Sequence, residues 1–259
     1  MRFPFYQVDA FAQRPLSGNP AAVCLLDAWP DDALLLNLAA ENNLSETAYL
    51  VPEARGWRLR WFTPKAEVAL CGHATLAAAQ VLHEIADGAR HTACFVTLSG
   101  VLNCTREDQG WRLDFPALPL LRCVDLPALP GVRVMEAWQG MDTVLVLQDA
   151  AAVRAFDPGH ALHAAFAPRR GLCVTAPGVA IGCDFVSRFF APHLGIVEDP
   201  VTGSAHCALA PLWAARLGRA ALQARQLSAR GGEVHCRVVG DRVHLVGQAV
   251  TVIRGEGFL

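Results

Sequence analysis

The chain contains Arg60-Trp61-Phe62-Thr63-Pro64 followed by Cys71-Gly72-His73-Ala74-Thr75, and a similar order returns in its second half. There Arg188-Phe189-Phe190-Ala191-Pro192 is followed by Gly203-Ser204-Ala205. An ordered Arg-x-Phe-x-Pro with a later glycine is harder to obtain by chance than scattered matches among alanines and leucines. Because an internal repeat can define a whole architecture, this one predicts two similar halves.

Matched positions extend outward from the repeated motif. At one constant offset the further pairs are Leu44 with Leu172, Thr47 with Thr175 and Ala48 with Ala176. After a short insertion, Gly72, Ala74, Ala77 and Ala79 match Gly203, Ala205, Ala208 and Ala210. Each half therefore contains strands, the motif, a glycine, an apolar helix and then more strands.

Hydrophobic periodicity indicates the type of each element. Residues 55–61 alternate tryptophan and leucine with arginine, which predicts a strand with one buried face. Residues 74–82 and 205–217 are apolar around most of the helix, as expected when other structure surrounds them. Pro211 should kink the second helix and end it early, because proline lacks the N–H donor.

These patterns predict an α+β fold with two pseudo-symmetric halves, each a strand-rich, barrel-like sheet around a central helix. A proline-rich connection between Pro116 and Pro130 marks the division. We therefore expect halves at residues 1–120 and 121–259, with the last strand free to pack against the first half.

Composition limits the classes of function. The 259 residues are 53% hydrophobic and 18% charged, with a formal net charge of -2, so disorder and general attraction to nucleic acid or anionic lipid are disfavoured. The amino-terminal residues lack the apolar region of a signal peptide, and polar residues interrupt the apolar stretch 68–85. We expect a cytoplasmic protein with no nucleic-acid or membrane partner.

The nine cysteines form an odd set without a C-x-x-C pair, which argues against a disulfide framework and a zinc site. Most of them should act as small hydrophobic residues, and only Cys71 has a context that indicates more. Motifs for phosphate binding, dinucleotide binding, serine hydrolases and zinc proteases are also absent. No metal or cofactor is expected.

Two kinds of position could carry chemistry. The predicted helix starts at Gly72 and Gly203 offer unpaired amides and a partial positive charge, which suit a carboxylate ligand. Plain capping by Asp199, Thr202 or Ser204 is the alternative. The second kind is Glu46, whose repeat partner is an apolar valine; beside apolar residues its pKa should be raised, as suits a proton carrier. A surface glutamate at a strand edge is the alternative there.

Several ordered motifs together resemble the phenazine-biosynthesis (PhzF-like) isomerases, from residue 9 to residue 232. They are Asp9-Ala10-Phe11, Gly18-Asn19-Pro20-Ala21-Ala22-Val23, Ser45-Glu46-Thr47-Ala48, Phe62-Thr63-Pro64, Glu67-Val68, Cys71-Gly72-His73-Ala74-Thr75, Glu198-Asp199-Pro200-Val201-Thr202-Gly203-Ser204-Ala205-His206 and Arg230-Gly231-Gly232. The resemblance implies a diaminopimelate epimerase-like fold with the active site in a cleft between the halves.

The resemblance also implies roles for individual residues. Glu46 would be the catalytic acid/base, with His73 and Asp199 as further catalytic residues. Substrate would be bound by the residues Gly72, Gly203, Ser204 and Asn19. Arg230 is a further candidate for binding an acid, and an exposed loop arginine is the alternative reading of it.

The characterised reaction of that family moves a proton between ring carbons of trans-2,3-dihydro-3-hydroxyanthranilate without a cofactor. By resemblance, the partner is a small carboxylate-bearing metabolite, and related proteins are often homodimers. One alternative is a diaminopimelate-epimerase-like racemase using Cys71, although Thr202 stands where its second thiol would be. Another is a non-catalytic protein that binds small acids.

Overall fold

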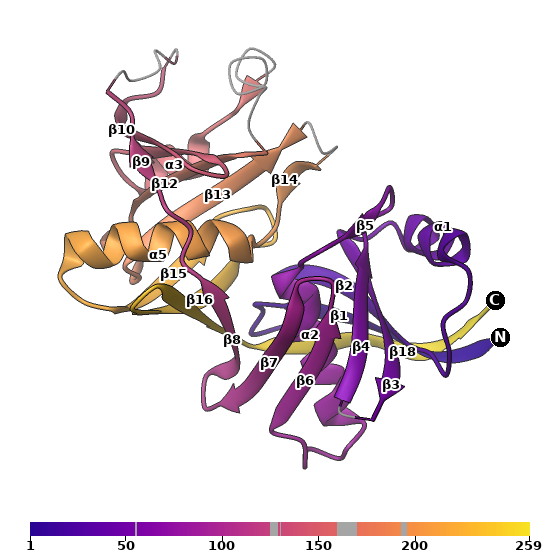
Figure 1. Cartoon of the computed structure of the whole chain (residues 1–259). Helices are drawn as coiled ribbons and strands as arrows, with labels where there is room; N and C mark the ends of the chain where they lie inside the picture. Colours follow the sequence, from indigo (N-terminus) through magenta and orange to yellow (C-terminus); the bar gives the residue numbers. More distant parts are fainter. Residues whose placement is uncertain (55, 125–128, 130, 160–169, 193–195) are drawn as a thin grey trace. The chain divides into compact units, whose positions relative to one another are not determined.

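The computed structural model describes residues 1–54, 56–124, 129, 131–159, 170–192 and 196–259. Two compact units divide the chain (Figure 1). The first unit comprises Met1–Asp114 and Val246–Leu259, and the second comprises Phe115–Leu245. The sequence placed the division after residue 120, and part of the proline-rich connection, at 125–128 and 130, lies outside the described residues.

The first unit is built from one continuous set of paired strands. Neighbouring strands pair in the order β18 (Ala249–Phe258), β1 (Arg2–Ala10), β2 (Asn19–Leu25), β3 (Glu46–Glu53), β4 (Gly56–Phe62), β6 (Thr92–Thr97), β7 (Gly100–Glu107) and β8 (Gly110–Pro116). The β2–β3 and β4–β6 pairs are parallel, and the other pairs are antiparallel. The short β5 (Glu67–Val68) adds to β4.

The second unit repeats this pattern of pairing. Neighbouring strands are β9 (Leu121–Arg122), β10 (Val134–Gln139), β11 (Thr143–Leu147), β12 (Leu172–Pro177), β13 (Phe185–Ala191), β15 (Ala221–Gln226) and β16 (Gly232–Val239). Here β11–β12 and β13–β15 are the parallel pairs, and β14 (Ile196–Asp199) adds to β13 as β5 adds to β4. The unit also contains a 3₁₀ turn, Val179–Ile181, and most of β17 (Arg242–Gly247), whose last two residues belong to the first unit. The predicted pseudo-symmetric α+β architecture is confirmed.

Each unit has one buried helix and one shorter helix. In the first unit α2 (Gly72–Glu84) packs against β1, β2, β3, β6 and β18, and α1 (Asp32–Asn42) packs against β3 and β4. In α2 every side chain from residue 74 to 79 is buried, most of them alanines that let the strands approach closely. The predicted central helix is confirmed (Figure 1).

The second unit contains α5 (Gly203–Leu217) and α3 (Ala150–Ala155). The expectation that Pro211 would end the second helix early is wrong, because α5 continues to Leu217. Proline removes the hydrogen bond to the carbonyl four residues earlier, that of Cys207. The backbone N–H of Leu118 donates to this carbonyl instead, at 3.1 Å. A neighbouring loop therefore satisfies the acceptor that the proline leaves open.

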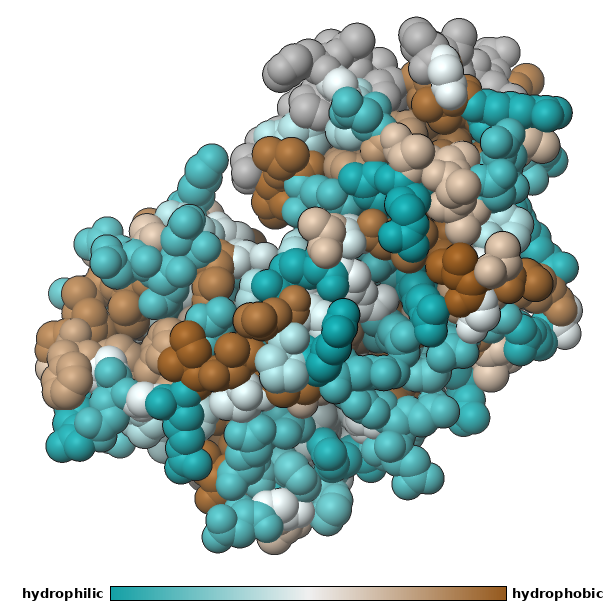
Figure 2. Space-filling model, turned by 180° about the vertical axis from the view of Figure 1, so that it is seen from behind, coloured by the Kyte–Doolittle hydropathy of each residue, from teal (hydrophilic) through white to brown (hydrophobic). Residues whose placement is uncertain are grey.

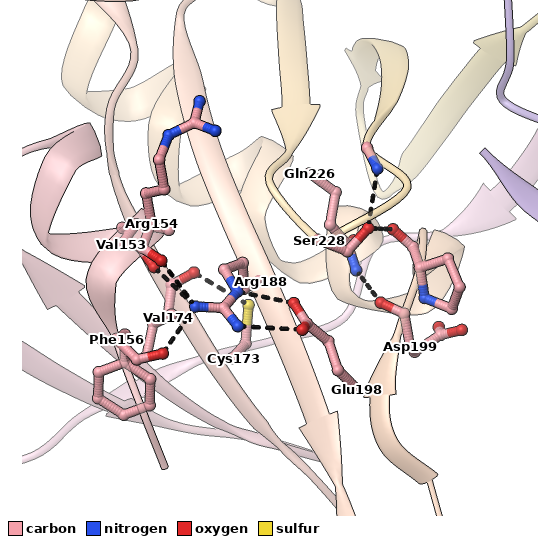
Figure 3. A network of polar contacts seen from close by, with 12 residues as sticks. Val153, Arg154, Phe156, Cys173, Val174, Arg188, Glu198, Asp199, Gln226 and Ser228 are labelled. Carbon is pink, nitrogen blue, oxygen red and sulfur yellow. Dashed lines mark hydrogen bonds and ion pairs between the residues drawn. The ribbon is translucent and has the colours of Figure 1, made fainter. Parts of the chain in front are cut away.

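The arginine of the repeated motif has the same structural role in both units. Arg60 on β4 forms a two-bond ion pair with Glu67 on β5, at 2.7 Å for both bonds. Arg188 on β13 does the same with Glu198 on β14, at 2.7 and 3.0 Å (Figure 3). Each guanidinium also lies about 5 Å from the ring of the motif phenylalanine. The motif therefore fastens a short edge strand to the sheet.

The surface mixes polar and apolar residues. Hydrophilic and hydrophobic residues are interspersed over the face shown in Figure 2. Within the described part of the chain, no helix has the length and apolar character needed to cross a membrane.

Candidate functional site

In the first unit, a strand and a helix bring Glu46 and His73 together. Glu46 is the first residue of β3, and His73 is the second residue of α2. Glu46 Oε2 lies 3.2 Å from His73 Nε2, and the side chains are only 14% and 8% exposed. This distance is that of an ion pair, and among the residues that the structure describes neither atom has a hydrogen-bond partner. The two predicted catalytic groups of this unit are thus paired and poorly satisfied.

Asn19 contacts the second ring nitrogen of His73, Nδ1. Its Nδ2 lies 3.3 Å from His73 Nδ1, and its Oδ1 accepts a hydrogen bond from Ser45 Oγ at 3.0 Å. The preceding Gly18 has a φ of +65°, and a Cβ there would clash with the carbonyl of Ala10. In a neutral His73, an Asn19 amide that donates to Nδ1 leaves the ring proton on Nε2, the nitrogen that faces Glu46. In the cation both ring nitrogens carry a proton, so the Asn19 amide no longer donates to Nδ1.

Cys71 completes this cluster, with Sγ 3.5 Å from His73 Nδ1. Burial raises the pKa of the Cys71 thiol, and the Glu46 carboxylate beside it raises that pKa further. Burial lowers the pKa of His73, but Cys71 and the Glu46 carboxylate raise it by more, and the net pKa lies well above its usual value. The cluster therefore holds a cationic imidazole beside Glu46.

The same three side chains carry atom types that can coordinate a metal ion. Among the described residues, Glu46, Cys71 and His73 have ligand atoms within 4.8 Å of one another. A transition metal requires a deprotonated thiol and a neutral imidazole. The raised pKa values of Cys71 and His73 oppose both, so the cluster is better suited to holding a proton.

We expect the ring protons of His73 and His206 to titrate in opposite directions. His206 is fully buried, and burial lowers its pKa to about 4, whereas that of His73 is raised. In an NMR pH titration, assigned with His73→Gln and His206→Asn, His73 should keep its proton above pH ~6.5, the usual pKa of histidine. His206 should stay neutral until about pH 4. A His73 signal that titrates below its usual pKa would contradict the charge state given above.

These shifts also set the pH dependence of stability. The contribution of His73 is complete below its unfolded pKa and is lost as the pH rises through its higher folded pKa. For His206 the unfolded state binds the proton more tightly, so stability falls as the pH drops from about 6.5 to about 4. The loss should be on the order of 3 kcal/mol in acid unfolding and should be absent from His206→Asn.

In the second unit, the start of α5 brings together Asp199, Thr202 and Gly203. Gly203 is the first helical residue, and Thr202 is the N-cap, without a side-chain capping bond to the helix. Instead, the Thr202 hydroxyl donates to Asp199 Oδ2 at 2.5 Å. The plain capping that the sequence offered as an alternative is therefore not made by Thr202.

Gln226, a residue that the sequence did not single out, organises this turn. Its Oε1 accepts from the backbone N–H of Thr202 at 2.9 Å, and its Nε2 donates to the Asp199 carbonyl at 2.6 Å. Ser228 donates to the carbonyl of Pro200 at 2.8 Å (Figure 3). A signal was present: Leu222, Ala224 and Gln226 share the buried phase of β15, and a buried amide in an apolar series indicates a specific partner.

We expect Gln226→Leu to loosen the Asp199–Thr202 turn and to destabilise the second unit. The change leaves a buried N–H and a carbonyl without their partners, which costs about 1–3 kcal/mol each at most. Urea unfolding should show the loss, and Gln223→Leu on the same strand, which is only partly buried, is the matched control. Equal stability of the two variants would contradict the role of Gln226.

Ser204 has partners that sequence reasoning also missed. Arg170 Nη2 donates to Ser204 Oγ at 2.9 Å. The same guanidinium binds the Asp142 carboxylate with two hydrogen bonds, from Nε at 2.9 Å and from Nη2 at 2.5 Å. Asp142 and Arg170 are far apart in the sequence and lie in no recognisable motif, so no sequence signal indicated them.

Each of the remaining predicted site residues also belongs to one of the two units. Gly72 begins α2 beside His73, and the N-cap Cys71 makes no side-chain capping bond. Arg230 lies in the loop between β15 and β16 and is partly buried rather than fully exposed. Thus Glu46, His73, Gly72 and Asn19 belong to the first unit, and the other predicted site residues belong to the second: Asp199, Gly203, Ser204 and Arg230.

Comparison with known proteins identifies the class of the fold and the family of the chain. The fold is of the epimerase class: the crystal structure of a hydroxyproline epimerase from Agrobacterium vitis matches with a TM-score of 0.63 at 12% identity, covering 98% of this chain and 92% of that one. The chain belongs to the phenazine biosynthesis-like protein family, whose model matches residues 8–115 and 127–255.

Closer relatives cover the chain from end to end. A Pseudomonas aeruginosa protein named an uncharacterized isomerase is 51% identical over 260 residues, 99% of this chain and 98% of that protein. The crystal structure of a PhzF family protein from Enterococcus faecalis has a TM-score of 0.93 at 44% identity, with both chains covered completely. The family resemblance expected from the motifs is confirmed.

Proposed function

We propose that this protein is a cofactor-independent isomerase that moves a proton on a small carboxylate-bearing metabolite. The observation that carries the proposal is the contact of Glu46 and His73, whose facing atoms are 3.2 Å apart, buried and without hydrogen-bond partners in the described part of the chain. Buried polar atoms are normally satisfied, and exceptions gather at functional sites. The names of the relatives, which include isomerases, support the same class.

Glu46 acts as the acid/base in this proposal. Its carboxylate takes a proton from one carbon of the substrate and delivers a proton to another carbon, so that atoms and charge balance over the cycle. While Glu46 holds the proton, it exchanges with solvent. Cationic His73 lies against the Glu46 carboxylate before the transfer. While Glu46 holds the proton, the imidazolium offsets the negative charge on the substrate.

The substrate carboxylate is bound by helix starts. The first turns of α2 and α5, at Gly72 and Gly203, lack side-chain caps, and such turns favour anions. Asn19, Ser204 and Arg230 bind the polar groups of the substrate, and Asp199 faces the reacting part.

A racemase that uses Cys71 is the second candidate. The Cys71 thiol contacts His73, as a catalytic thiol paired with a base would. Two features oppose this candidate: burial raises the pKa of Cys71, and the equivalent N-cap in the second unit is Thr202, whose hydroxyl is bound to Asp199. A second thiol at that position is therefore missing.

Solvent exchange tests the proposal. A panel of small unsaturated carboxylic acids is incubated with the protein in heavy water, and deuterium uptake is followed by mass spectrometry. Uptake that survives Cys71→Ser and disappears in Glu46→Gln supports the isomerase. Uptake that depends on Cys71 supports the racemase, and binding without uptake supports a non-catalytic protein.

A further inference from the structure

We propose that Arg170 and Asp142 are a positioning pair that makes Ser204 a hydrogen-bond donor for the carboxylate of the substrate. This inference rests on the proposed function and adds two residues to it. The pair binds no substrate atom itself: its charges cancel, and its effect passes through the Ser204 hydroxyl, 2.9 Å from Arg170 Nη2.

The guanidinium has a fixed orientation. The Asp142 side chain is 7% exposed and that of Arg170 is 32% exposed, and the two are joined by a fork of two hydrogen bonds. A fork of this kind fixes the plane of the guanidinium. The ring of Phe189 lies 5.5 Å from the guanidinium carbon and restricts it further. Nη2 therefore faces Ser204 Oγ as a permanent donor.

A hydrogen-bond donor bound to a serine hydroxyl determines whether that hydroxyl can donate to a ligand. The hydroxyl has one proton and two lone pairs. Accepting from Arg170 occupies one lone pair, and the positive guanidinium turns the serine proton away from itself. Ser204 is therefore left as a donor in the first turn of α5, where it suits a carboxylate oxygen and disfavours an ammonium group.

The pseudo-symmetry of the chain supports this assignment. β2 and β11 occupy equivalent places, each with a parallel partner strand, and α2 and α5 are equivalent helices. In the first unit Asn19, the first residue of β2, contacts His73, the second residue of α2. In the second unit Asp142, just before β11, reaches Ser204, the second residue of α5, through Arg170. Both units therefore use the start of this strand to orient the same helical position.

Acetate is the probe for the Arg170–Asp142 pair and Ser204, because its carboxylate is its only polar group. Protein labelled with ¹⁵N at glycine is titrated with acetate, and the amide signal of Gly203, assigned with Gly203→Ala, reports binding at the start of α5. Asp142→Asn combined with Arg170→Gln keeps the net charge and leaves no unpaired buried charge, so it tests position rather than electrostatic attraction. Arg219→Gln, which breaks the Arg219–Asp184 pair in the same unit, is the control.

We expect the double variant to weaken acetate binding about fivefold, the value of one hydrogen bond. Ser204→Ala should weaken it to the same extent, and the triple variant should show no further loss, because the pair acts through Ser204. A merely structural role would weaken binding in the Ser204→Ala background as well. The Arg219→Gln control should bind acetate as the wild type does.

Three results would overturn the inference: a Gly203 signal that ignores acetate, equal affinity in the wild type and the double variant, or additive losses in the triple variant. The proposed function fails separately. In Glu46→Gln, the Gly203 signal should respond to acetate as it does in the wild type. If the wild type shows no proton exchange into any substrate, the isomerase proposal is contradicted, but the acetate result for Arg170 still stands.

Discussion

Glu46→Gln is expected to reduce proton transfer to substrate by about 10²–10⁴-fold, the usual contribution of a general acid/base group. The amide keeps the shape of the side chain but cannot accept and return a proton. Because the Glu46 carboxylate is one of the groups that raise the pKa of His73, the variant should also lower that pKa. Deuterium exchange into substrate and an NMR titration of His73 measure the two effects.

A matched control lies on the same strand. Glu53, the last residue of β3, is exposed, so Glu53→Gln changes the net charge equally and should leave exchange intact. Circular dichroism should show both variants folded. Retained exchange in Glu46→Gln, or an unchanged titration of His73, would remove Glu46 from the role proposed for it.

Arg188→Met is expected to destabilise the second unit by about 3 kcal/mol, since it leaves Glu198 largely buried without its partner. Besides that ion pair, Arg188 Nη1 donates to three carbonyl oxygens at the end of α3, those of Val153, Arg154 and Phe156, at 3.3, 3.0 and 2.6 Å (Figure 3). These acceptors would also lose a donor. Urea unfolding and hydrogen exchange of β12 and β13 would measure the loss.

The repeat supplies the control for this variant. Arg60→Met breaks the equivalent pair with Glu67 in the first unit, but among the described residues Arg60 has no hydrogen bond to a helix carbonyl. Its other ion pair is with the mostly exposed Asp32, and its guanidinium also lies 5.2 Å from the ring of Trp29. We expect a smaller loss, about 1–2 kcal/mol, confined to the first unit. Equal losses in both variants would show that the carbonyl contacts of Arg188 add nothing to stability.

Much of the fold could be predicted because local patterns and tertiary structure agree. The Arg-x-Phe-x-Pro motif recurs because each copy fastens an edge strand through an ion pair, and α2 is alanine-rich because strands surround it. The length of α5 could not be predicted. It depends on the N–H of Leu118, distant in sequence, which satisfies the carbonyl that Pro211 leaves open.

The site was predictable where chemistry leaves a mark in the sequence. Glu46 stands out because its repeat partner is apolar, and the structure pairs it with His73. Gln226 could have been found from the alternation of β15. Arg170 and Asp142 could not, because an ion pair between two loop residues depends on how β10, β11 and β12 are arranged and on no local pattern.

The first and last strands of the chain, β1 and β18, are neighbours in the first unit. β18 pairs with β1 along its length, and the N–H of Leu259 donates to the carbonyl of Met1 at 2.8 Å. The first unit is therefore interrupted in the sequence by the whole of the second. During synthesis β1 must wait for β18, which follows the whole second unit in the sequence, so the first unit is completed after the second. Since the two ends of the chain are neighbours, a short linker could join them and new ends could be opened in an exposed loop.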